Sequence, residues 1–440
     1  MMKRLLTLTL LAGSFVLTAI AAEPTVANRQ TASNYYAYPY PELPLPKLTA
    51  TPKGYEPFHM EHYGRHGSRW HIGTWVYHSP IDLLRPAERN GKLTEQGKEL
   101  MAQLREIEIN SRGRDGELTP LGARQHRGIA QRMTRNFPEI FSGKSRVDAR
   151  STDVVRCILS MDNEMQELKA FNPNIEITTD GSKRDVRYLN YNDTAAENRY
   201  NEARKRLNAE ENALLEANKI DYAAFAGQLI DDPQFIADSI DSRGLFDAIF
   251  RITANAQSHD DQKARYDLFT DKDLHSKWVL DNANWFLRYG NTKMTDGAGP
   301  MRQRYLMRNW IESADTAIMR REPGANMRFG HEVVVLPMAV LMELDDYGRE
   351  INDPTAIESQ WHNYDLLPMA SNIQMIFYRP TGKADYRAED VLVKVLFNER
   401  EMRLPVKAVS GPYYRWSDIR SHYLDRIGAD GGIFPPEQPY

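Results

Sequence analysis

The chain has 440 residues, of which 41% are hydrophobic and 26% are charged, so it is long enough for one large core or for two domains. Its formal net charge of -4 shows no basic bias, and we therefore expect neither nucleic acid nor a membrane surface among its partners. The single cysteine, Cys157, excludes an internal disulfide and any zinc site built on several cysteines. Because Cys157 lies in the apolar run 154–159, we expect a buried small side chain rather than a catalytic one.

The first residues predict a secretory signal peptide. Two basic residues at 3–4 precede an apolar run over 5–20, and small residues follow at 19–22. This order is typical of a signal that is cleaved near Ala21 or Ala22. A membrane anchor is the alternative, but the run is short for a membrane span. We therefore expect a periplasmic or secreted protein without stable membrane association after cleavage.

The next segments predict a leader and a first strand. Residues 23–54 are rich in Pro, Ala, Thr and Tyr and lack a clear periodicity, which predicts an extended leader. Residues 55–63 predict a strand that runs into the loop around His66. Glu61 is an awkward fit to a fully buried strand.

Helices alternate with a short strand over the following hundred residues. Apolar spacing predicts a helix over 94–109. Thr119 and Pro120 predict the start of another, with Thr119 as N-cap and Pro120 at the first helical position. A strand over 147–150 then precedes a third helix, which residues 151–153 can cap.

A change in character divides this α/β pattern. Residues 181–315 are polar, favour helix and carry scattered aromatic side chains, which predicts a mostly helical insertion. The segments after it predict strands over 327–330, 373–378 and 391–397, a hairpin from the last of these into 402–406, and helices over 333–344 and 416–427. The fold class is therefore α/β: a parallel-sheet sandwich core flanked by helices, with an inserted helical cap. The predicted parts are the signal peptide (1–22), the leader (23–54), a first core part (55–180), the cap (181–315) and a second core part (316–440).

The strongest candidates for chemistry are Arg65, His66 and Gly67, with Ser68 and Arg69 directly after them. Guanidinium groups match phosphate oxygens in bidentate fashion, and an imidazole among them suits attack on a captured dianion. Gly67 lets the backbone approach a ligand closely. Two alternatives are a merely basic surface stretch and a metal site built from the histidines of this region: His59, His62, His66, His71 and His78.

Two further candidates also follow predicted strands, namely Arg150 and the pair His331 and Glu332. Ligands of open α/β sheets bind at the carboxyl ends of the strands, so these distant segments could converge on His66. Each has a structural alternative. Arg150 could be a salt-bridged arginine at a helix start, His331 a core histidine, and Glu332 a carboxylate that the following helix N-terminus stabilises.

Four segments carry a resemblance to a known family. Residues 65–69 resemble the signature loop of the histidine phosphatase superfamily, in its acid phosphatase and phytase branch, which includes the multiple inositol polyphosphate phosphatases. Residues 117–125 resemble its LTxxGxxQ helix start, 149–153 its RSTD segment, and 328–332 its late HD segment. The resemblance spans roughly residues 55–345 without most of the insertion, and it implies a parallel-sheet α/β core with a variable helical cap.

The resemblance implies an exported phosphomonoesterase that hydrolyses a small-molecule phosphate ester through a phosphohistidine. His66 would attack phosphorus, and Glu332 would protonate the leaving alkoxide and then activate water. Neither a metal nor a cofactor is expected, because arginines already supply the positive charge. Four residues would clamp the phosphoryl oxygens: Arg65, Arg69, Arg150 and His331.

Two positions depart from the family pattern. His71 stands where the branch often has proline, and Glu332 directly follows His331 where most acid phosphatases have aspartate. The inositol polyphosphate phosphatases usually have an alanine between the histidine and the glutamate, and this chain lacks it. We expect the longer side chain of Glu332 to reach the leaving oxygen.

Basic clusters of the insertion bear on the substrate. They could hold further phosphates, as an inositol polyphosphate (phytate-like) substrate requires, but a solvated charged face is slightly favoured. The members are Lys183, Arg184 and Arg187 near its start, and Lys293, Arg302, Arg304 and Arg308 near its end. A phosphomutase and a catalytically weak phosphate-binding protein are the alternative functions. The signal peptide opposes the first, and the intact His66 opposes the second.

Overall fold

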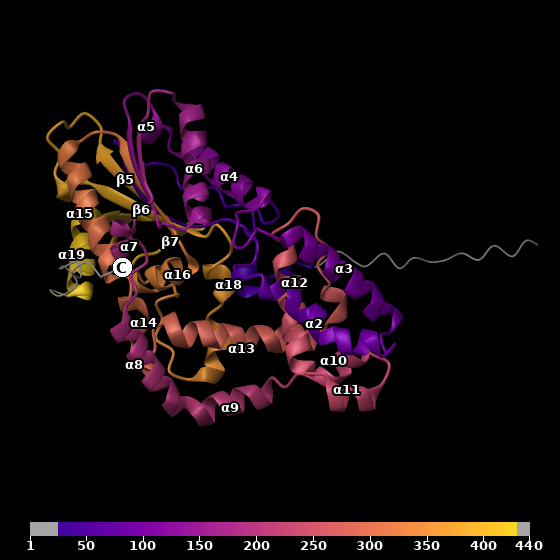
Figure 1. Ribbon diagram of the computed structural model, residues 1–440. Helices are drawn as coiled ribbons and strands as arrows, with labels where there is room; N and C mark the ends of the chain where they lie inside the picture. Colours follow the sequence, from indigo (N-terminus) through magenta and orange to yellow (C-terminus); the bar gives the residue numbers. More distant parts are fainter. Residues whose placement is uncertain (1–24, 429–440) are drawn as a thin grey trace, which may run out of the picture.

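The computed structural model describes residues 25–428, so the predicted signal peptide lies outside the described residues. Figure 1 shows a sheet with helices on both faces and a group of helices beside it. The described residues form one sheet of nine strands in the order β3-β2-β4-β1-β5-β6-β9-β8, with β7 paired to β6. The strands are β1 Tyr55–Arg65, β2 Arg146–Ser151, β3 Glu176–Asp180, β4 Gly324–Gly330, β5 Asn372–Pro380, β6 Leu392–Phe397, β7 Arg400–Met402, β8 Ala408–Ser410 and β9 Tyr413–Arg415.

The sheet is parallel on one side only. Strands β3, β2, β4 and β1 run parallel, which confirms the predicted parallel core, and all the later strands pair antiparallel. The connections after β5 hold no long crossover helix, and parallel pairing requires one. The predicted hairpin follows β6, with Asn398 and Glu399 in the left-handed region, but its second strand is β7 rather than residues 402–406.

Helices cover both faces of this sheet. On one face lie α4 (Pro120–Asn136), α5 (Pro138–Phe141) and α6 (Val155–Phe171), and on the other α7 (Lys183–Leu189), α15 (Arg304–Arg320), α16 (Glu332–Leu341) and α19 (Trp416–Ile427). Side chains of a strand alternate between the faces. Met60 of β1 therefore packs under α4 to α6, whereas Tyr63 packs in the opposite layer.

The helical part divides differently from the predicted cap. Helices α2 (Trp75–Arg89) and α3 (Glu95–Ser111), expected in the first core part, share a hydrophobic cluster with α10 (Tyr222–Gly227), α11 (Pro233–Ser239) and α12 (Ser242–Ala256). Figure 1 shows these five helices together at the right. Helix α13 (Asp271–Tyr289) and α15 pack instead into the sheet core, with α14 (Ala298–Met301) against α16. Helices α8 (Thr194–Arg204) and α9 (Asn208–Ala217) lie at the lower edge of the figure.

The leader is more structured than predicted. It forms helix α1 (Val26–Gln30) and a 3-10 turn, η1 (Ser33–Tyr35), and it buries Tyr36 and Tyr38 against the body of the protein. Its aromatic side chains supply the apolar area that fixes it, although they show no periodicity. Among residues 25–428, no helix combines the length and the apolar character that a membrane crossing requires.

The predicted cap of α4 is confirmed, because the Thr119 hydroxyl accepts a hydrogen bond from the N–H of Gly122. Thr94 caps α3 in the same way by accepting from Gly97, although the apolar spacing predicted only the helix and not its cap. Helix α6 begins at Val155 without a side-chain cap. The prediction that residues 151–153 cap it is wrong, because the Thr152 hydroxyl contacts His331 instead.

Glu61 and His62 are both fully buried in the middle of β1, on opposite faces. The awkward Glu61 carboxylate is tolerated because one oxygen, Oε1, accepts hydrogen bonds from Ser313 (2.8 Å) and Asn326 (2.7 Å) and lies 3.0 Å from Nε2 of His59. Within residues 25–428, neither ring nitrogen of His62 has a hydrogen-bond partner. Burial lowers the pKa of His62 to about 3, with a smaller contribution from His126.

This buried imidazole predicts a loss of stability in acid. Between the folded pKa of about 3 and the unfolded value of 6.5, the unfolded chain binds more protons, so the free energy of unfolding falls as the pH falls through that window. Replacing His62 by Leu should remove about 1.4 kcal/mol per pH unit of this dependence. Urea unfolding at several values between about pH 4 and pH 6 measures the slope. Equal slopes in both proteins would contradict the expectation.

Candidate active site

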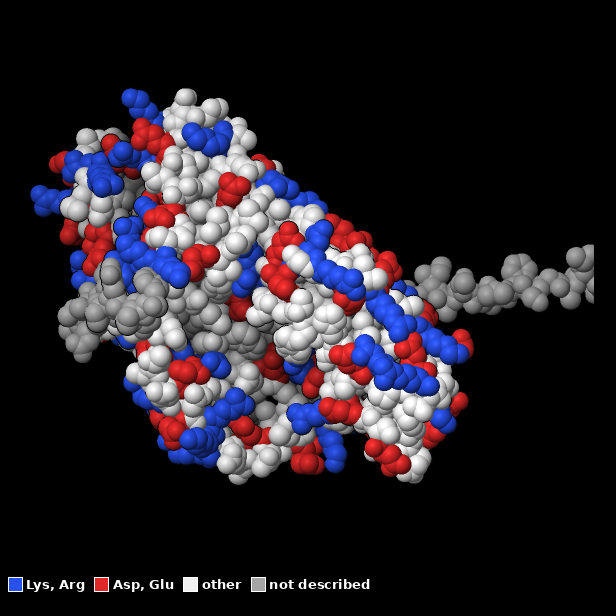
Figure 2. Space-filling model, viewed as in Figure 1, with Lys and Arg blue, Asp and Glu red and all other residues white. Residues whose placement is uncertain are grey.

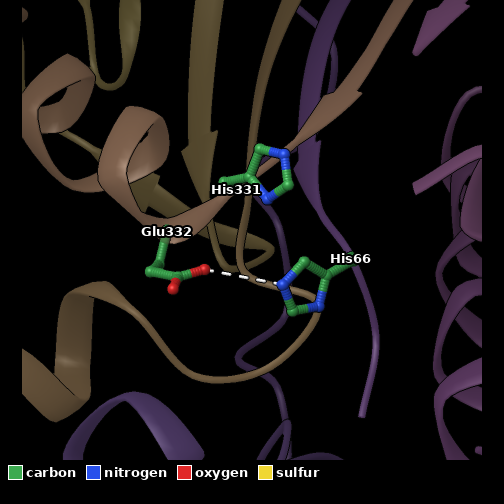
Figure 3. Close-up of side chains that lie close together, drawn as sticks. All are labelled: His66, His331 and Glu332. Carbon is green, nitrogen blue, oxygen red and sulfur yellow. Dashed lines mark ion pairs between the residues drawn. The ribbon is translucent and has the colours of Figure 1, made fainter. Parts of the chain in front are cut away.

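Two segments that are far apart in the sequence meet at the carboxyl edge of the parallel strands. Arg65 at the end of β1 lies opposite Gly330 at the end of β4, and the N–H of His66 donates to the carbonyl of Gly330 at 2.9 Å. Figure 3 shows the side chains of His66, His331 and Glu332 brought together there. The His66 and His331 ring centres are 5.7 Å apart. The predicted convergence of the His66 loop with His331 and Glu332 is therefore observed.

The His66 imidazole is neutral and presents a free lone pair. Its Nδ1 lies 3.0 Å from the carbonyl oxygen of Gly67, which can only accept, so Nδ1 carries the proton. Nε2 is buried, has no hydrogen-bond partner among the described residues and lies 3.5 Å from the Glu332 carboxylate. Burial holds the pKa of His66 well below its usual value, and the charges of Arg65 and Arg69 lower it further, although Glu332 opposes them. Nε2 is therefore available as a nucleophile even in acid.

The start of α4 holds the His66 loop in place. The N–H of Ser68 donates to Oε1 of Gln125 (2.9 Å), and the N–H of Thr119 donates to the carbonyl of Ser68 (2.9 Å). A Cβ atom on Gly67 would lie 2.6 Å from the carbonyl oxygen of Gly122, so only glycine permits this close approach. These contacts give a physical reason for the motif at residues 117–125.

The two arginines of the loop are buried and oriented by uncharged groups. The Nη1 of Arg65 donates to the carbonyl of Leu367, and its Nη2 donates to that of Asn34 at 2.7 Å. The Nη1 of Arg69 donates to the carbonyl of Trp70 at 3.0 Å. No carboxylate among the described residues pairs with Arg69, and the Nε of each arginine has no hydrogen-bond partner. The positive charge is therefore concentrated beside Nε2 of His66.

Glu332 occupies the centre of this positive charge. Its Oε2 lies 3.2 Å from Nε of Arg65 and 3.5 Å from Nε2 of His66. Burial alone would raise the pKa of Glu332, but the charge of Arg65 outweighs it, with a smaller contribution from Arg69, and that pKa lies well below its usual value. The carboxylate is therefore ionised and sits where an anion is most stable.

Arg156 is the residue of this site that sequence reasoning missed. It is the second residue of α6, its side chain is partly buried, and no carboxylate of the described chain pairs with it. Its charge reaches His331: burial lowers the pKa of His331 to about 4, and Arg156, Arg65 and Arg69 add to this against the opposing effect of Glu332. Because helix α6 begins shortly after β2, its first turn lies at the same carboxyl edge. The position of Arg156 in that first turn is the feature of the sequence that could have indicated its place in the site.

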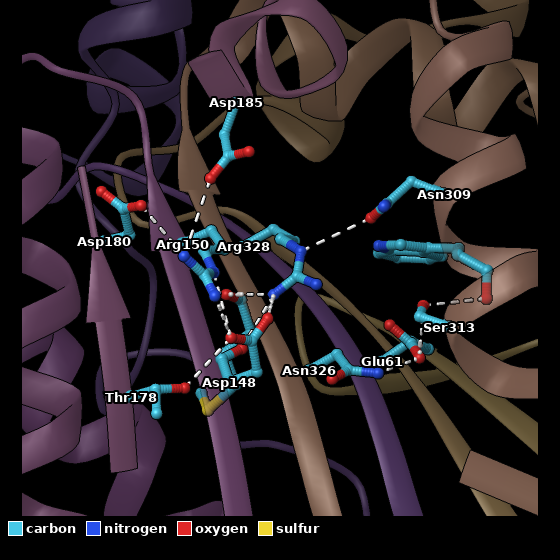
Figure 4. Close-up of polar contacts among 12 residues, drawn as sticks. Glu61, Asp148, Arg150, Thr178, Asp180, Asp185, Asn309, Ser313, Asn326 and Arg328 are labelled. Carbon is cyan, nitrogen blue, oxygen red and sulfur yellow. Dashed lines mark hydrogen bonds and ion pairs between the residues drawn. The ribbon is translucent and has the colours of Figure 1, made fainter. Parts of the chain in front are cut away.

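Arg150, by contrast, is not brought into this group. It lies opposite Arg328 in the sheet, before the edge is reached, and its guanidinium contacts the carboxylates of Asp148 (2.7 Å) and Asp180 (3.0 Å). Figure 4 shows this network, in which Asp185 also faces Arg150. Nearby carboxylates thus cancel the charge of Arg150, as the salt-bridge alternative predicted.

His331 is held from two sides. The backbone N–H of His331 donates to the hydroxyl of Tyr63 (3.3 Å), and the ring nitrogen Nε2 lies 3.2 Å from the Thr152 hydroxyl. The Cys157 sulfur is 3.8 Å from the same nitrogen. Cys157 is buried, as predicted, and burial raises the pKa of its thiol to about 12.

Acidic side chains neutralise much of the positive charge of the two predicted basic clusters. On the face shown in Figure 2, basic and acidic residues are interspersed rather than gathered into a field of one sign. Lys183, Arg184 and Arg187 lie on α7. Five members of the two clusters form ion pairs: Arg184 with Asp180, Lys293 with Glu350, Arg302 with Glu197, Arg304 with Asp193 and Arg308 with Glu312.

The crowded histidines do not assemble into the alternative metal site. His59 and His62 point to opposite faces of β1, His71 contacts the carbonyl of Arg251, and His78 lies near Glu108. In the described part of the chain, the ligand atoms of His66, His331 and Glu332 do lie within 4.8 Å of one another, close enough to hold a metal ion. The unpaired charges of Arg69 and Arg156 favour an anion there instead.

Comparisons place this arrangement among known structures. Neither a protein-family model nor a curated protein matches the sequence. A multiple inositol polyphosphate phosphatase from Bifidobacterium longum, solved with inositol hexasulfate, superposes with a TM-score of 0.71 at 16% identity, over 92% of this chain and all of that one. A phytase from D. castellii superposes with a TM-score of 0.65 at 14% identity, over 96% of this chain and 91% of that one.

The chain has the histidine acid phosphatase fold. A phytase from Klebsiella sp. ASR1 agrees at a TM-score of 0.53 and 12% identity, over 88% of this chain and 98% of that one. The predicted fold class is thereby confirmed. The likeness also extends beyond residues 55–345, to which the sequence motifs were confined.

Proposed function

We propose that this protein is an exported phosphomonoesterase that forms a phosphohistidine at Nε2 of His66. One observation carries the proposal: Nε2 of a neutral His66, 3.5 Å from the Glu332 carboxylate, faces a site in which Arg69 and Arg156 have no carboxylate partner among the described residues. Such a site binds a phosphate dianion and offers it a nucleophile. The apolar run after Lys3 and Arg4 supports export.

Substrate binding exchanges one anion for another. The phosphate dianion takes the place that the Glu332 carboxylate holds beside Arg65 and His66. Two negative charges cannot share that position, so Glu332 moves toward the ester oxygen. Away from Arg65, its carboxylate loses the partner that kept it ionised, and it takes up a proton.

The first displacement then proceeds in line. Nε2 of His66 forms a bond to phosphorus while the bond from phosphorus to the ester oxygen breaks, and Glu332 gives its proton to that oxygen. Arg65, Arg69, Arg156 and His331 stabilise the charge on the phosphoryl oxygens. In the second displacement, Glu332 takes a proton from water, the water oxygen bonds to phosphorus, and the bond to Nε2 breaks to give inorganic phosphate.

Inositol polyphosphates are the proposed first substrates to test. The Bifidobacterium longum phosphatase of the same fold was solved with inositol hexasulfate and with phosphate. The compensated charges of Arg302 and Arg304 weaken the case for several extra phosphate contacts, so simple monoesters belong in the same panel.

The experiment is single-turnover labelling of the purified protein without residues 1–22. Labelled p-nitrophenyl phosphate should yield phosphate and, on quenching, an acid-labile and base-stable label on His66, which His66→Ala lacks. Hydrolysis with the label on another residue would overturn the mechanism. Binding of phosphate without hydrolysis of any ester would instead support the binding-protein alternative. With a labelled inositol monophosphate in place of p-nitrophenyl phosphate, transfer of the label to another hydroxyl of the same ring would support the mutase.

A further inference from the structure

A short segment of the leader contacts both arginines of the His66 loop. The carbonyl of Asn34 accepts a hydrogen bond from Nη2 of Arg65 at 2.7 Å. The guanidinium carbon of Arg69 lies 5.5 Å from the centre of the Tyr35 ring. Residues more than thirty positions before the loop therefore form part of its wall.

These contacts orient the guanidinium groups without cancelling their charge. A carbonyl or an aromatic face attracts a cation, but neither brings a formal negative charge. The contrast is Arg150, which is held by carboxylates and is thereby neutralised. Arg69 has no carboxylate partner among the described residues, so the Tyr35 ring is one of the few groups that restrain it.

The segment itself is fixed to the core on one side. The hydroxyl of Ser33 accepts from the side chain of Asn363 (2.8 Å), and the carbonyl of Tyr36 accepts from the N–H of Met369 (2.7 Å). These two bonds flank Asn34 and Tyr35 and hold them against the site.

On its other side, the same leader segment is fixed to the group of helices that contains α12. The N–H of Ala37 donates to Gln257 at 3.0 Å, directly after α12. The Tyr35 ring packs edge-on against His71, at 5.0 Å between ring centres. The position of Tyr35 is therefore determined from both parts of the protein, and a fixed ring can define the position of a mobile guanidinium.

We propose that residues 33–37 are a positioning segment of the phosphate site, in which Tyr35 sets the place of Arg69 and the Asn34 carbonyl sets that of Arg65. This rests on the proposed function, because the arginines need a fixed place only if an anion binds between them. Without the ring, the Arg69 side chain spreads over several rotamers, and holding one of them costs part of the binding free energy.

The test compares Tyr35→Leu with Tyr35→Phe in inhibition by inorganic phosphate and in kcat/KM for p-nitrophenyl phosphate. Tyr35→Leu should weaken phosphate binding by about tenfold, whereas Tyr35→Phe, which keeps the aromatic face, should stay within about twofold of the parent protein. Tyr40→Leu is the matched control. Its ring also stacks on an arginine of the body, Arg132 at 4.2 Å, but that arginine is bound to Glu399.

A double substitution separates positioning from other roles. In an Arg69→Gln background, Tyr35→Leu should cause no further loss of kcat/KM, because the group that it positions is absent. The same loss in both backgrounds, or no loss in either, would overturn the proposal. If Tyr35→Leu does not fold, Tyr35→Met fills similar space without an aromatic face. A parent protein that neither binds phosphate nor cleaves esters would refute the proposed function instead.

Discussion

Replacing Glu332 by Gln should slow the hydrolysis of alkyl phosphates by about two to four orders of magnitude, the usual contribution of a general acid. The side chain keeps its size but cannot deliver a proton to a strongly basic alkoxide. The kcat/KM for p-nitrophenyl phosphate should fall far less, because nitrophenolate leaves without protonation. A series of esters with graded leaving-group pKa, compared by kcat/KM, measures the difference, because this ratio reports the first displacement and not the later attack of water. An equal loss across the series would remove Glu332 from the role of acid.

The same variant should bind inorganic phosphate more tightly than the parent protein. The Glu332 carboxylate competes for the place beside Arg65 and His66, and the neutral amide competes less. Calorimetric titration with phosphate measures this, and weaker binding would show that the carboxylate does not occupy the anion position. The opposite signs of the two effects distinguish this outcome from general damage to the site.

The pH dependence of kcat follows from the same displacement. In the free protein the pKa of Glu332 lies well below its usual value, mainly because Arg65 outweighs the effect of burial. Bound phosphate separates the two groups, so the pKa of Glu332 rises in the complex. For alkyl esters, kcat should therefore fall as the pH rises through that higher pKa, and this alkaline limb should be absent in Glu332→Gln.

Local sequence signals predicted the elements that carry the site. The Thr119 cap, the strand before His66 and the boundaries of α19 depend on near neighbours, which the sequence displays directly. Which helices pack against one another depends on residues that are far apart in the sequence. The apolar face of α3 predicted a helix, but nothing in its spacing indicated that α2, which also packs on α12, would contact it rather than the sheet.

The candidate site shows the same limit at the level of single residues. His66, Arg65, Arg69, His331 and Glu332 lie together because each belongs to the end of a central strand or to the loop or helix that follows it. The leader offered no such pattern. Its contacts with Arg65 and Arg69 use a backbone carbonyl and one aromatic ring, and neither feature distinguishes residues 33–37 from other tyrosine-rich turns.

Arg156 rather than the predicted Arg150 lies at the site, and the geometry of the sheet explains why. A strand residue before the carboxyl edge points to one face of the sheet. On that face Arg150 meets the carboxylates of Asp148 on β2, Asp180 on β3 and Asp185 on α7. A residue in the first turn of the following helix lies beyond the edge of the sheet, and no carboxylate in the described part of the chain pairs with Arg156 there. The pKa of Arg156 agrees with a place beside Arg69. Burial lowers this pKa most, and the positive charge of Arg69 lowers it further.

Arg156→Gln should therefore lower kcat/KM by about two to three orders of magnitude, as expected for the loss of one charged group that stabilises the transition state. Arg156→Lys should fall between, because an ammonium group keeps the charge but not the planar fork. Arg150→Gln is the matched control. It should leave kcat/KM within about threefold of the parent protein while lowering the thermal stability, since it removes the cation from a group of three carboxylates.

Steady-state kinetics with one ester and a thermal unfolding curve for each variant decide the matter. A large loss of activity in Arg150→Gln with little effect in Arg156→Gln would return the third arginine to the position that the sequence motif indicated. Comparable losses of kcat/KM in both variants would mean that the ion-pair network around Arg150 also positions residues of the site. The expected outcome assigns the third arginine of the phosphate site to α6, because Arg156, unlike Arg150, has no carboxylate partner among the described residues.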